Sequence, residues 1–352
     1  MFSILRLNEM EKWDTLVKSF ADYDIYYLSS YVKGLELHGD GEPLLFYYQT
    51  NGLRAMTIAM KRDIASSPIF KGQIEANRFF DLITPYGYGG FIFEGDFNEQ
   101  ALRDLEEAYT SFCSKIKFVS ELVRLRPFSK NLKLEEAIYK VRPLGKTVTI
   151  ILDTPEQIWQ DLSSTRRRVI RKAVKQGVTV YWGRSPEMLE TFIALYQATM
   201  LKDKATDYYY FGQDFYASVL EDLKHHLMFF YAEYKGEVIA SAMILFANHR
   251  MHYHLSGAKV AYNHLSPTSC IIYEAACWGS ENGYHLFHLG GGLASREDEL
   301  YRFKKNFNKH SNTSFAIGQK IFDEDVYQEL LSIRNQTSDQ LPRENFFPSY
   351  RS

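Results

Sequence analysis

The chain has 352 residues, of which 45% are hydrophobic and 24% are charged, and its formal net charge is −2. This length can bury one large core or two ordinary ones, and the composition is that of a folded protein rather than a disordered one. A net charge near zero gives no bulk attraction to nucleic acid. DNA is therefore not expected as a partner, and any contact with RNA would be local.

The sequence shows no sign of export, membrane insertion or metal binding. No stretch is apolar over a membrane-spanning length, and the first residues lack the basic and apolar regions of a secretory signal. Neither the three cysteines nor the ten histidines have the spacing of metal ligands. We therefore expect a cytoplasmic protein with free thiols, no metal site and at most peripheral contact with a membrane.

The first half predicts a hairpin, a glycine-rich bend, a helix and a strand. Asn51-Gly52 separates two β-rich runs and favours the positive φ angles of a tight hairpin turn. The expected elements are the hairpin strands 44–50 and 53–60, a strand from Asp81 into the bend 85–90, a helix at 98–115 and a strand at 118–127.

The second half repeats this order of elements. Ser266 can cap its helix, and Pro267 suits the first helical position. The expected elements are the hairpin strands 227–234 and 238–246, a strand at 250–257, a helix at 267–281 and a strand at 284–289 that runs into Gly290-Gly291-Gly292. The repetition predicts a duplicated α+β unit. We expect domains at 1–145 and 146–337, followed by a loosely held tail at 338–352.

Two segments carry candidate functional side chains. On a helix at 162–175, the cations Arg168, Arg171 and Lys172 share one face. That face could bind phosphates of a nucleotide, a tRNA end or a lipid-linked pyrophosphate, or it could simply be solvated. In the segment 298–307, a helix would bury two phenylalanines at i and i+4, and Lys304 beside them could be an ordinary surface side chain.

Four segments in order resemble the Fem-type peptidoglycan aminoacyltransferases and their GNAT-like relatives. They are Tyr253-His254-Leu255-Ser256-Gly257-Ala258, Leu265-Ser266-Pro267 with its helix, the strand 283–291, and Leu300-Tyr301-Arg302-Phe303-Lys304-Lys305-Asn306-Phe307. The basic helix matches the one that opens the second GNAT unit of that family. The resemblance implies an α+β fold of tandem duplicated GNAT-like (acyl-CoA N-acyltransferase) units, with mixed central sheets flanked by helices.

The resemblance also implies a site. Lys304 matches the family lysine that stabilises charge near the transferred carbonyl, where the tetrahedral intermediate carries an oxyanion. The helix after the bend would present its N-terminal amides to a donor pyrophosphate. The residues implied are Tyr301, Tyr253 and Tyr86 along the acceptor cleft, Arg168, Arg171 and Lys172 as further substrate contacts, and Ser266, Thr268 and Ser269 at the donor.

Among the departures of the chain from the family pattern, two concern the donor and the base. Asn263-His264-Leu265-Ser266-Pro267 stands where a Gly-rich phosphate loop is usual, and a glycine-free loop allows less close approach to phosphate. His288 stands where the family often has an acidic residue; it could act as a base, since its ordinary pKa suits neutral proton transfer, or be structural. No tightly bound cofactor is therefore expected, and the acyl donor is either aminoacyl-tRNA or acyl-CoA.

The activity expected from the resemblance is transfer of an aminoacyl or acyl group to an amine of a cell-envelope precursor, of peptidoglycan or of a surface polysaccharide. The precursor could be a small molecule or lipid-linked, and a tRNA donor would be held by its acceptor end. Two alternatives stay open. One is an acyl-CoA-dependent N-acyltransferase acting on an amino sugar or another small amine, and the other is a non-catalytic GNAT-like binding module.

Overall fold

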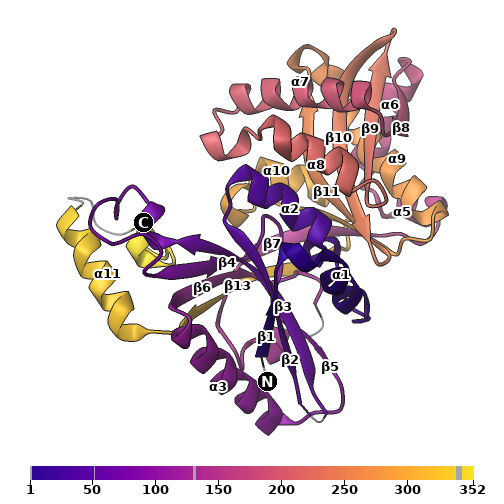
Figure 1. The fold of residues 1–352 in the computed structure, drawn as a ribbon. Coiled ribbons are helices and arrows are strands. Elements are labelled where there is room, and N and C mark those ends of the chain that lie inside the picture. Colours follow the sequence, from indigo (N-terminus) through magenta and orange to yellow (C-terminus); the bar gives the residue numbers. More distant parts are fainter. Residues whose placement is uncertain (1, 51, 130–131, 338–342) are drawn as a thin grey trace. The chain divides into compact units, whose positions relative to one another are not determined.

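The computed structural model describes the whole chain except residues 1, 51, 130–131 and 338–342 (Figure 1). The chain forms two compact units, one made of residues 1–144 and 315–352 and the other of residues 145–314. Each unit has a mixed sheet with helices packed on it. The prediction of an α+β protein built from two tandem units is therefore confirmed.

The sheet of the first unit has the strand order β1-β2-β3-β4-β6-β13, and β5 pairs with β3. Only β4 and β6 are parallel neighbours in this order. The strands are β1 (Phe2–Leu5), β2 (Glu42–Gln49), β3 (Arg54–Asp63), β4 (Phe80–Ile83), β5 (Ile92–Glu94), β6 (Phe118–Arg124) and β13 (Thr313–Ile321). The helices are α1 (Met10–Lys18), α2 (Ser29–His38), α3 (Glu99–Lys115), α4 (Leu132–Glu135) and α11 (Glu324–Thr337).

The sheet of the second unit has the order β7-β12-β11-β10-β9-β8, and here only β11 and β12 are parallel. The strands are β7 (Lys140–Ile151), β8 (Thr179–Gly183), β9 (Leu227–Tyr234), β10 (Glu237–Ala247), β11 (Arg250–Ala258) and β12 (Leu286–Gly291). The helices are α5 (Pro155–Asp161), α6 (Ser164–Lys175), α7 (Pro186–Lys202), α8 (Gln213–Asp222), α9 (Pro267–Glu281) and α10 (Glu299–Lys305). Ile170 of α6 and Ile271 of α9 lie in one core with Phe230 of β9.

The division between the units differs from the expected domain bounds. Sequence analysis placed residues 315–337 with the second half, whereas in the structure they belong to the first unit. The reason is strand pairing, because β13 pairs antiparallel with β6 from Ile317 opposite Arg124 to Ile321 opposite Ser120. Helix α11 then buries Tyr327 and Leu330 in the core of that unit. The first unit thus takes its last strand from the second half of the chain.

The end of the chain is also held more firmly than the sequence suggested. Residues 338–342 lie outside the described residues, but Tyr350 is fully buried and Arg351 pairs with the buried carboxylate of Asp81. Arg62 Nε also reaches Asp81, at 2.9 Å. Because a buried carboxylate without cations would be very costly, this pairing ties the last residues to β4.

The predicted elements are confirmed, with one exception at a helix start. Lys235 and Gly236 both adopt positive φ angles, of 53° and 79°, as the second hairpin requires. Of the first hairpin turn, Asn51 lies outside the described residues. Ser266 was expected to cap its helix, but it adopts a left-handed φ of 51° and its side chain makes no capping hydrogen bond. Helix α9 therefore begins at Pro267 without a side-chain cap.

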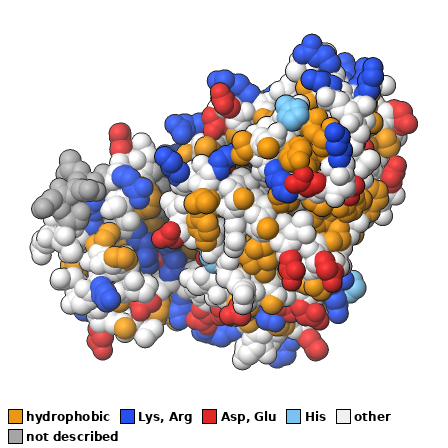
Figure 2. All heavy atoms as spheres, turned by 90° about the horizontal axis from the view of Figure 1, so that it is seen from above, with side chains coloured by type: hydrophobic (Ala, Val, Ile, Leu, Met, Phe, Trp, Pro, Cys, Tyr) orange, Lys and Arg blue, Asp and Glu red, His pale blue; other side chains and the backbone are white. Residues whose placement is uncertain are grey.

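The surface of the molecule is mixed in charge. Figure 2 shows Lys and Arg side chains interspersed with Asp and Glu over most of the visible face. Among the described residues, no group of three or more His, Cys, Asp or Glu side chains is placed to hold a metal ion. No helix within the described ranges is both long and apolar enough to cross a membrane.

Candidate functional site

The parallel strands β11 and β12 separate after the first third of β11. They pair only from Arg250 opposite Leu286 to His252 opposite His288, although β11 continues to Ala258. Beyond His252, β11 pairs with β10 alone among the described residues. Backbone groups need hydrogen-bond partners, and ligands of open α/β sheets gather at the carboxyl ends of strands. The separation of these strands therefore marks a candidate site in the second unit.

A β-bulge interrupts β11 at the same point. Met243 of β10 faces Leu255, while the next residue, Ile244, faces Tyr253. His254 is consequently the additional residue of the bulge, and bulges re-aim side chains and end regular pairing. Further along β11, an added Cβ at Gly257 would lie 2.3 Å from the Leu195 carbonyl carbon, so α7 approaches this strand very closely.

Three histidines lie around the separation of the strands. The rings of His252 and His288 are 5.9 Å apart between centroids, and both side chains are buried. Burial, with a smaller contribution from His252, lowers the pKa of His254 to about 3, so this imidazole is neutral at physiological pH. Sequence analysis nominated only His288. The sequence does not indicate that His252 lies opposite His288, because the register between β11 and β12 is set by the tertiary structure.

Lys304 is buried at the end of β12. Its side chain is 8% exposed, and Nζ donates a hydrogen bond to the carbonyl oxygen of Gly291 at 2.8 Å. Burial lowers the pKa of Lys304 to about 8, although Asp298 opposes that shift. Gly290 has a φ of 76°, and a Cβ there would be 3.3 Å from Nζ. The alternative that Lys304 is an ordinary surface lysine is therefore wrong.

The helix that carries Lys304 begins with a well-formed cap. The carboxylate of Asp298 accepts a hydrogen bond from Tyr301 N at 3.0 Å. Phe303 and Phe307 are in contact, with ring centroids 5.5 Å apart, as expected from their spacing. Tyr301 is buried in the same core, and Tyr253 packs against that core. Burial raises the pKa of Tyr253 to about 12, which keeps its hydroxyl protonated.

Tyr86 is the one predicted site residue in the first unit. Tyr31 donates a hydrogen bond from its hydroxyl to the backbone carbonyl of Tyr86, which fixes the bend. Tyr301 and Tyr253 belong to the second unit. A joint role of Tyr86 with these two residues therefore stays a prediction.

The start of α9 holds the three residues predicted to face a donor. Ser269 N donates to the carbonyl of Ser266 at 3.0 Å, and the Ser269 hydroxyl is buried. That hydroxyl accepts a hydrogen bond from Arg166, so it serves an internal contact. Ser266 and Thr268 are half-buried. The first amides of the helix keep their dipolar preference for anions.

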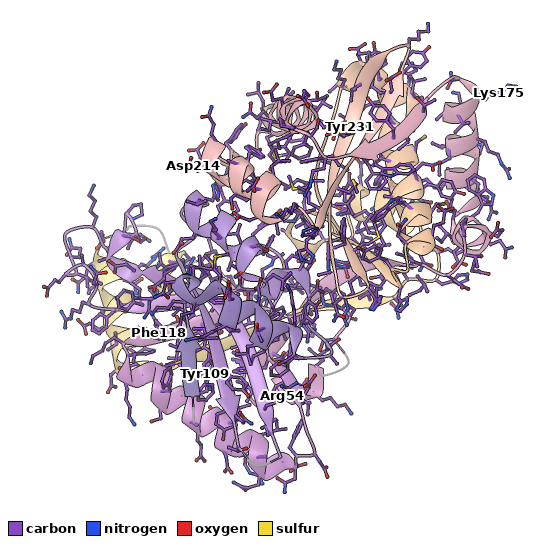
Figure 3. The ribbon with its side chains drawn as sticks, turned by 45° about the vertical axis from the view of Figure 1, so that its right-hand side comes forward. Arg54, Tyr109, Phe118, Lys175, Asp214 and Tyr231 are labelled. Carbon is purple, nitrogen blue, oxygen red and sulfur yellow. The ribbon has the colours of Figure 1, made fainter. Side chains whose placement is uncertain are left out.

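The cations of α6 form an exposed face, as predicted. Arg168, Arg171, Lys172 and Lys175 are all exposed. Figure 3 shows Lys175, at the C-terminal end of α6, directed away from the sheet. Among the described residues, no carboxylate pairs with any of the four. Arg171 also stacks on Trp159, with its guanidinium carbon 5.1 Å from the ring centroid.

The residue that sequence analysis missed is Arg166, which points inward from the same helix. It is 8% exposed and contacts both α9 and α10. Helical periodicity could have found it, because Arg166 stands four residues before Ile170 and seven before Ala173, on the buried face. A basic run conceals such a residue, since charged side chains are ordinarily assigned to the surface.

Comparison with known proteins supports this architecture. Residues 161–305 match the acetyltransferase (GNAT) domain family. No curated protein matches the chain. A crystal structure of FemX superposes with a TM-score of 0.66 at 14% identity, over 93% of this chain and 99% of that one.

Two further solved structures have the same fold. The C-terminal domain (DUF2156) of a putative lysylphosphatidylglycerol synthetase from Agrobacterium fabrum gives a TM-score of 0.56 at 13% identity, over 92% of this chain and 94% of that one. A tandem GNAT protein from the clavulanic acid biosynthesis pathway gives 0.52 at 8% identity, over 92% and 98%. The chain thus has the fold of these tandem proteins, and its residues 161–305 match the acetyltransferase (GNAT) domain family.

Proposed function

We propose that the second unit is an acyltransferase that moves an acyl or aminoacyl group to an amine of a cell-envelope precursor. The observation that carries this proposal is Lys304, a buried cation beside the point where β11 and β12 separate. Acyl transfer passes through a tetrahedral oxyanion, and a preorganised cation in a desolvated site stabilises that charge strongly. With a pKa of about 8, Lys304 is roughly nine-tenths protonated at pH 7.

The proposed reaction begins with attack of the acceptor amine on the donor's acyl carbonyl. The new C–N bond forms while the carbonyl oxygen becomes an oxyanion next to Lys304. Collapse of this intermediate breaks the bond to the donor's sulfur or oxygen. The proton released by the amine passes to a base and then to the leaving group. His288 is the proposed base, because it lies at the last position of β12 that pairs with β11.

The proposed donor lies along the edge of β11 beyond His252, with its phosphates near the start of α9. The cations of α6 add a surface that suits a polyphosphate or an RNA end. Tyr301 and Tyr253 are the proposed acceptor contacts in this unit. Because the loop before α9 lacks the glycines that allow close approach to phosphate, an aminoacyl-tRNA donor is favoured over acyl-CoA.

A second candidate is an acyl-CoA-dependent N-acyltransferase acting on an amino sugar or another small amine. The observation that favours it is the start of α9, where no side chain caps the first amides. Those amides can receive a pyrophosphate without any charged side chain. A GNAT-like binding module would use the same surfaces without turnover.

A donor assay separates these candidates. Charged tRNA and acyl-CoA are offered separately, each with a panel of amino sugars and muropeptides, and product is followed by mass spectrometry. Product with charged tRNA alone supports the leading proposal, and product with acyl-CoA alone replaces it with the second. Donor binding without product under every combination points to the binding module. Failure to bind either donor contradicts all three.

A further inference from the structure

Arg166 connects the two halves of the proposed site. Its Nη1 donates to the hydroxyl of Ser269, in the first turn of α9, and its Nη2 donates to the carbonyl of Phe303 at 3.0 Å. Its guanidinium carbon lies 4.4 Å from the ring centroid of Phe303 and 4.5 Å from that of Phe307. The guanidinium therefore lies against two aromatic rings that contact each other, and it also bonds to two helices.

A second contact fastens the same helices at their ends. Ser163, which caps α6, donates through its hydroxyl to Asn306 Oδ1 at 2.7 Å and through its amide to the Asn306 carbonyl at 3.0 Å. Asn306 follows the last residue of α10. The start of α6 is thus fixed to the end of α10. Arg166 contacts Phe303, the residue immediately before Lys304.

The chemistry of Arg166 is unusual for a purely structural contact. Among the described residues no carboxylate pairs with it, and burial lowers its pKa to about 10. Burying a cation on carbonyl and hydroxyl acceptors alone is costly, and an apolar side chain would fill the same space at lower cost. Departures of this kind from the most stable arrangement concentrate at functional sites.

Helix α10 needs such a contact because it is short. It has seven residues, and an isolated helix of that length is unstable in water. The position of Lys304 is therefore set by the groups that hold α10 from outside, and Arg166 is the one that also reaches α9.

We propose that Arg166 is a positioning residue, which holds Lys304 in register with the first turn of α9. The inference rests on the proposed function for its catalytic meaning, but the geometry it predicts can be tested without any substrate. Lysine cannot replace arginine here, because a single ammonium nitrogen lacks the planar fork that donates to Ser269 and Phe303 from two separate nitrogens.

The test measures the pKa of Lys304 in the full chain. Competitive acylation of lysines as a function of pH, read by mass spectrometry of the Lys304 peptide, gives this value directly. In Arg166→Lys and Arg166→Met, α10 loosens and Lys304 gains access to water, so its pKa should rise from about 8 towards the ordinary 10.5. Ser269→Ala, which removes only one acceptor, should move it less and in the same direction.

Arg334→Lys is the matched control. Arg334 is even more deeply buried and also donates to a main-chain oxygen, that of Ser352, but it belongs to the first unit. Both arginine-to-lysine variants should lower the melting temperature, and only the Arg166 variant should shift the pKa of Lys304. An unchanged pKa in a folded Arg166 variant, or an equal shift in Arg334→Lys, overturns the proposal. If Arg166 variants do not fold, the Ser269→Ala comparison decides.

Turnover gives an independent readout. If the acyltransfer proposal holds, Arg166→Lys should lower kcat by 10- to 100-fold and change KM by less than about threefold, because a misplaced catalytic group costs rate rather than binding. If the native protein turns over no donor, the proposed function fails while the pKa comparison still tests the positioning role.

Discussion

The two units share one strand order but differ where their parallel strands meet. In the first unit the backbone closes the space between β4 and β6. Thr84 N donates to Leu122 O at 3.1 Å, and Arg124 N donates to the Thr84 hydroxyl at 2.8 Å. The glycine-rich bend then rejoins β6 through Gly89 N and Arg124 O, 2.8 Å apart. In the second unit, strand pairing of β11 with β12 stops at His252.

The helices α3 and α9, which lie between these parallel strands in the chain, differ in how their first turns are capped. Helix α3 of the first unit is capped by Asn98, whose side chain accepts from Ala101 N at 3.0 Å. Helix α9 of the second unit has Ser266 in that place, with no side-chain hydrogen bond to the helix. In the first unit, a side chain of the protein accepts a hydrogen bond from an amide at the start of α3. In the second unit no side chain does so at the start of α9, which leaves that helix start to a ligand.

The buried ionisable groups of the two units differ, although both units bury arginine. The first unit buries Glu121 and Glu135, and desolvation raises their pKa values to about 7 and about 8. The second unit buries Lys304 and Arg166, whose pKa values are lowered. Of these groups, Lys304 is the cation that our proposal places beside the oxyanion.

The largest effect should follow removal of the cation itself. We expect Lys304→Ala to lower kcat by about 100- to 1,000-fold, the range for loss of one oxyanion-stabilising group. The adjacent Lys305, half-buried on the same helix, provides the matched control. Lys305→Ala should keep most of the activity. Steady-state kinetics with the donor found by the assay above measure both, and equal losses in the two variants would place the site elsewhere.

The first unit should be most sensitive at its C-terminal anchor. Arg351→Ala leaves the fully buried Asp81 with fewer cationic partners, so we expect a loss of about 3 kcal/mol in the free energy of unfolding. Chemical denaturation followed by fluorescence measures this loss. Arg351→Lys keeps the charge and should recover part of it. A loss below about 0.5 kcal/mol would show that the tail does not contribute to the stability of the first unit.

Glu121 of the first unit and Lys304 of the second should change the stability of the folded protein in opposite directions as the pH rises. The carboxyl of Glu121 binds its proton more tightly in the folded state, so its contribution lowers stability as the pH rises from about 4.5 to about 7. Lys304 binds its proton less tightly when folded, so its contribution raises stability between about pH 8 and 10.5. Glu121→Gln should flatten the first slope and Lys304→Met the second, as measured by melting temperature against pH. An unchanged slope in either variant contradicts its assignment.

Sequence patterns predicted the duplicated order of elements because hairpin turns, helix stripes and glycine bends are local. They did not predict that β13 returns to the first unit, since strand pairing between distant segments leaves no local mark. The site was predicted unevenly for the same reason. Lys304 was found through a motif. Arg166 was not singled out within its basic run, and the pairing of His252 with His288 depends on strand register.

The smallest effect tests the contrast between the helix starts. Asn98→Ala removes a side-chain cap from α3 and should cost about 1 kcal/mol of unfolding free energy. Ser266→Ala removes no capping bond from α9 and should cost close to nothing. Ser266→Gly should even stabilise the unit, by about 1 kcal/mol, because a left-handed φ of 51° strains any residue with a Cβ. Denaturation midpoints of the three variants measure these differences. If Ser266→Ala costs as much as Asn98→Ala, the start of α9 is capped after all, and the amides that we assign to a ligand are already occupied.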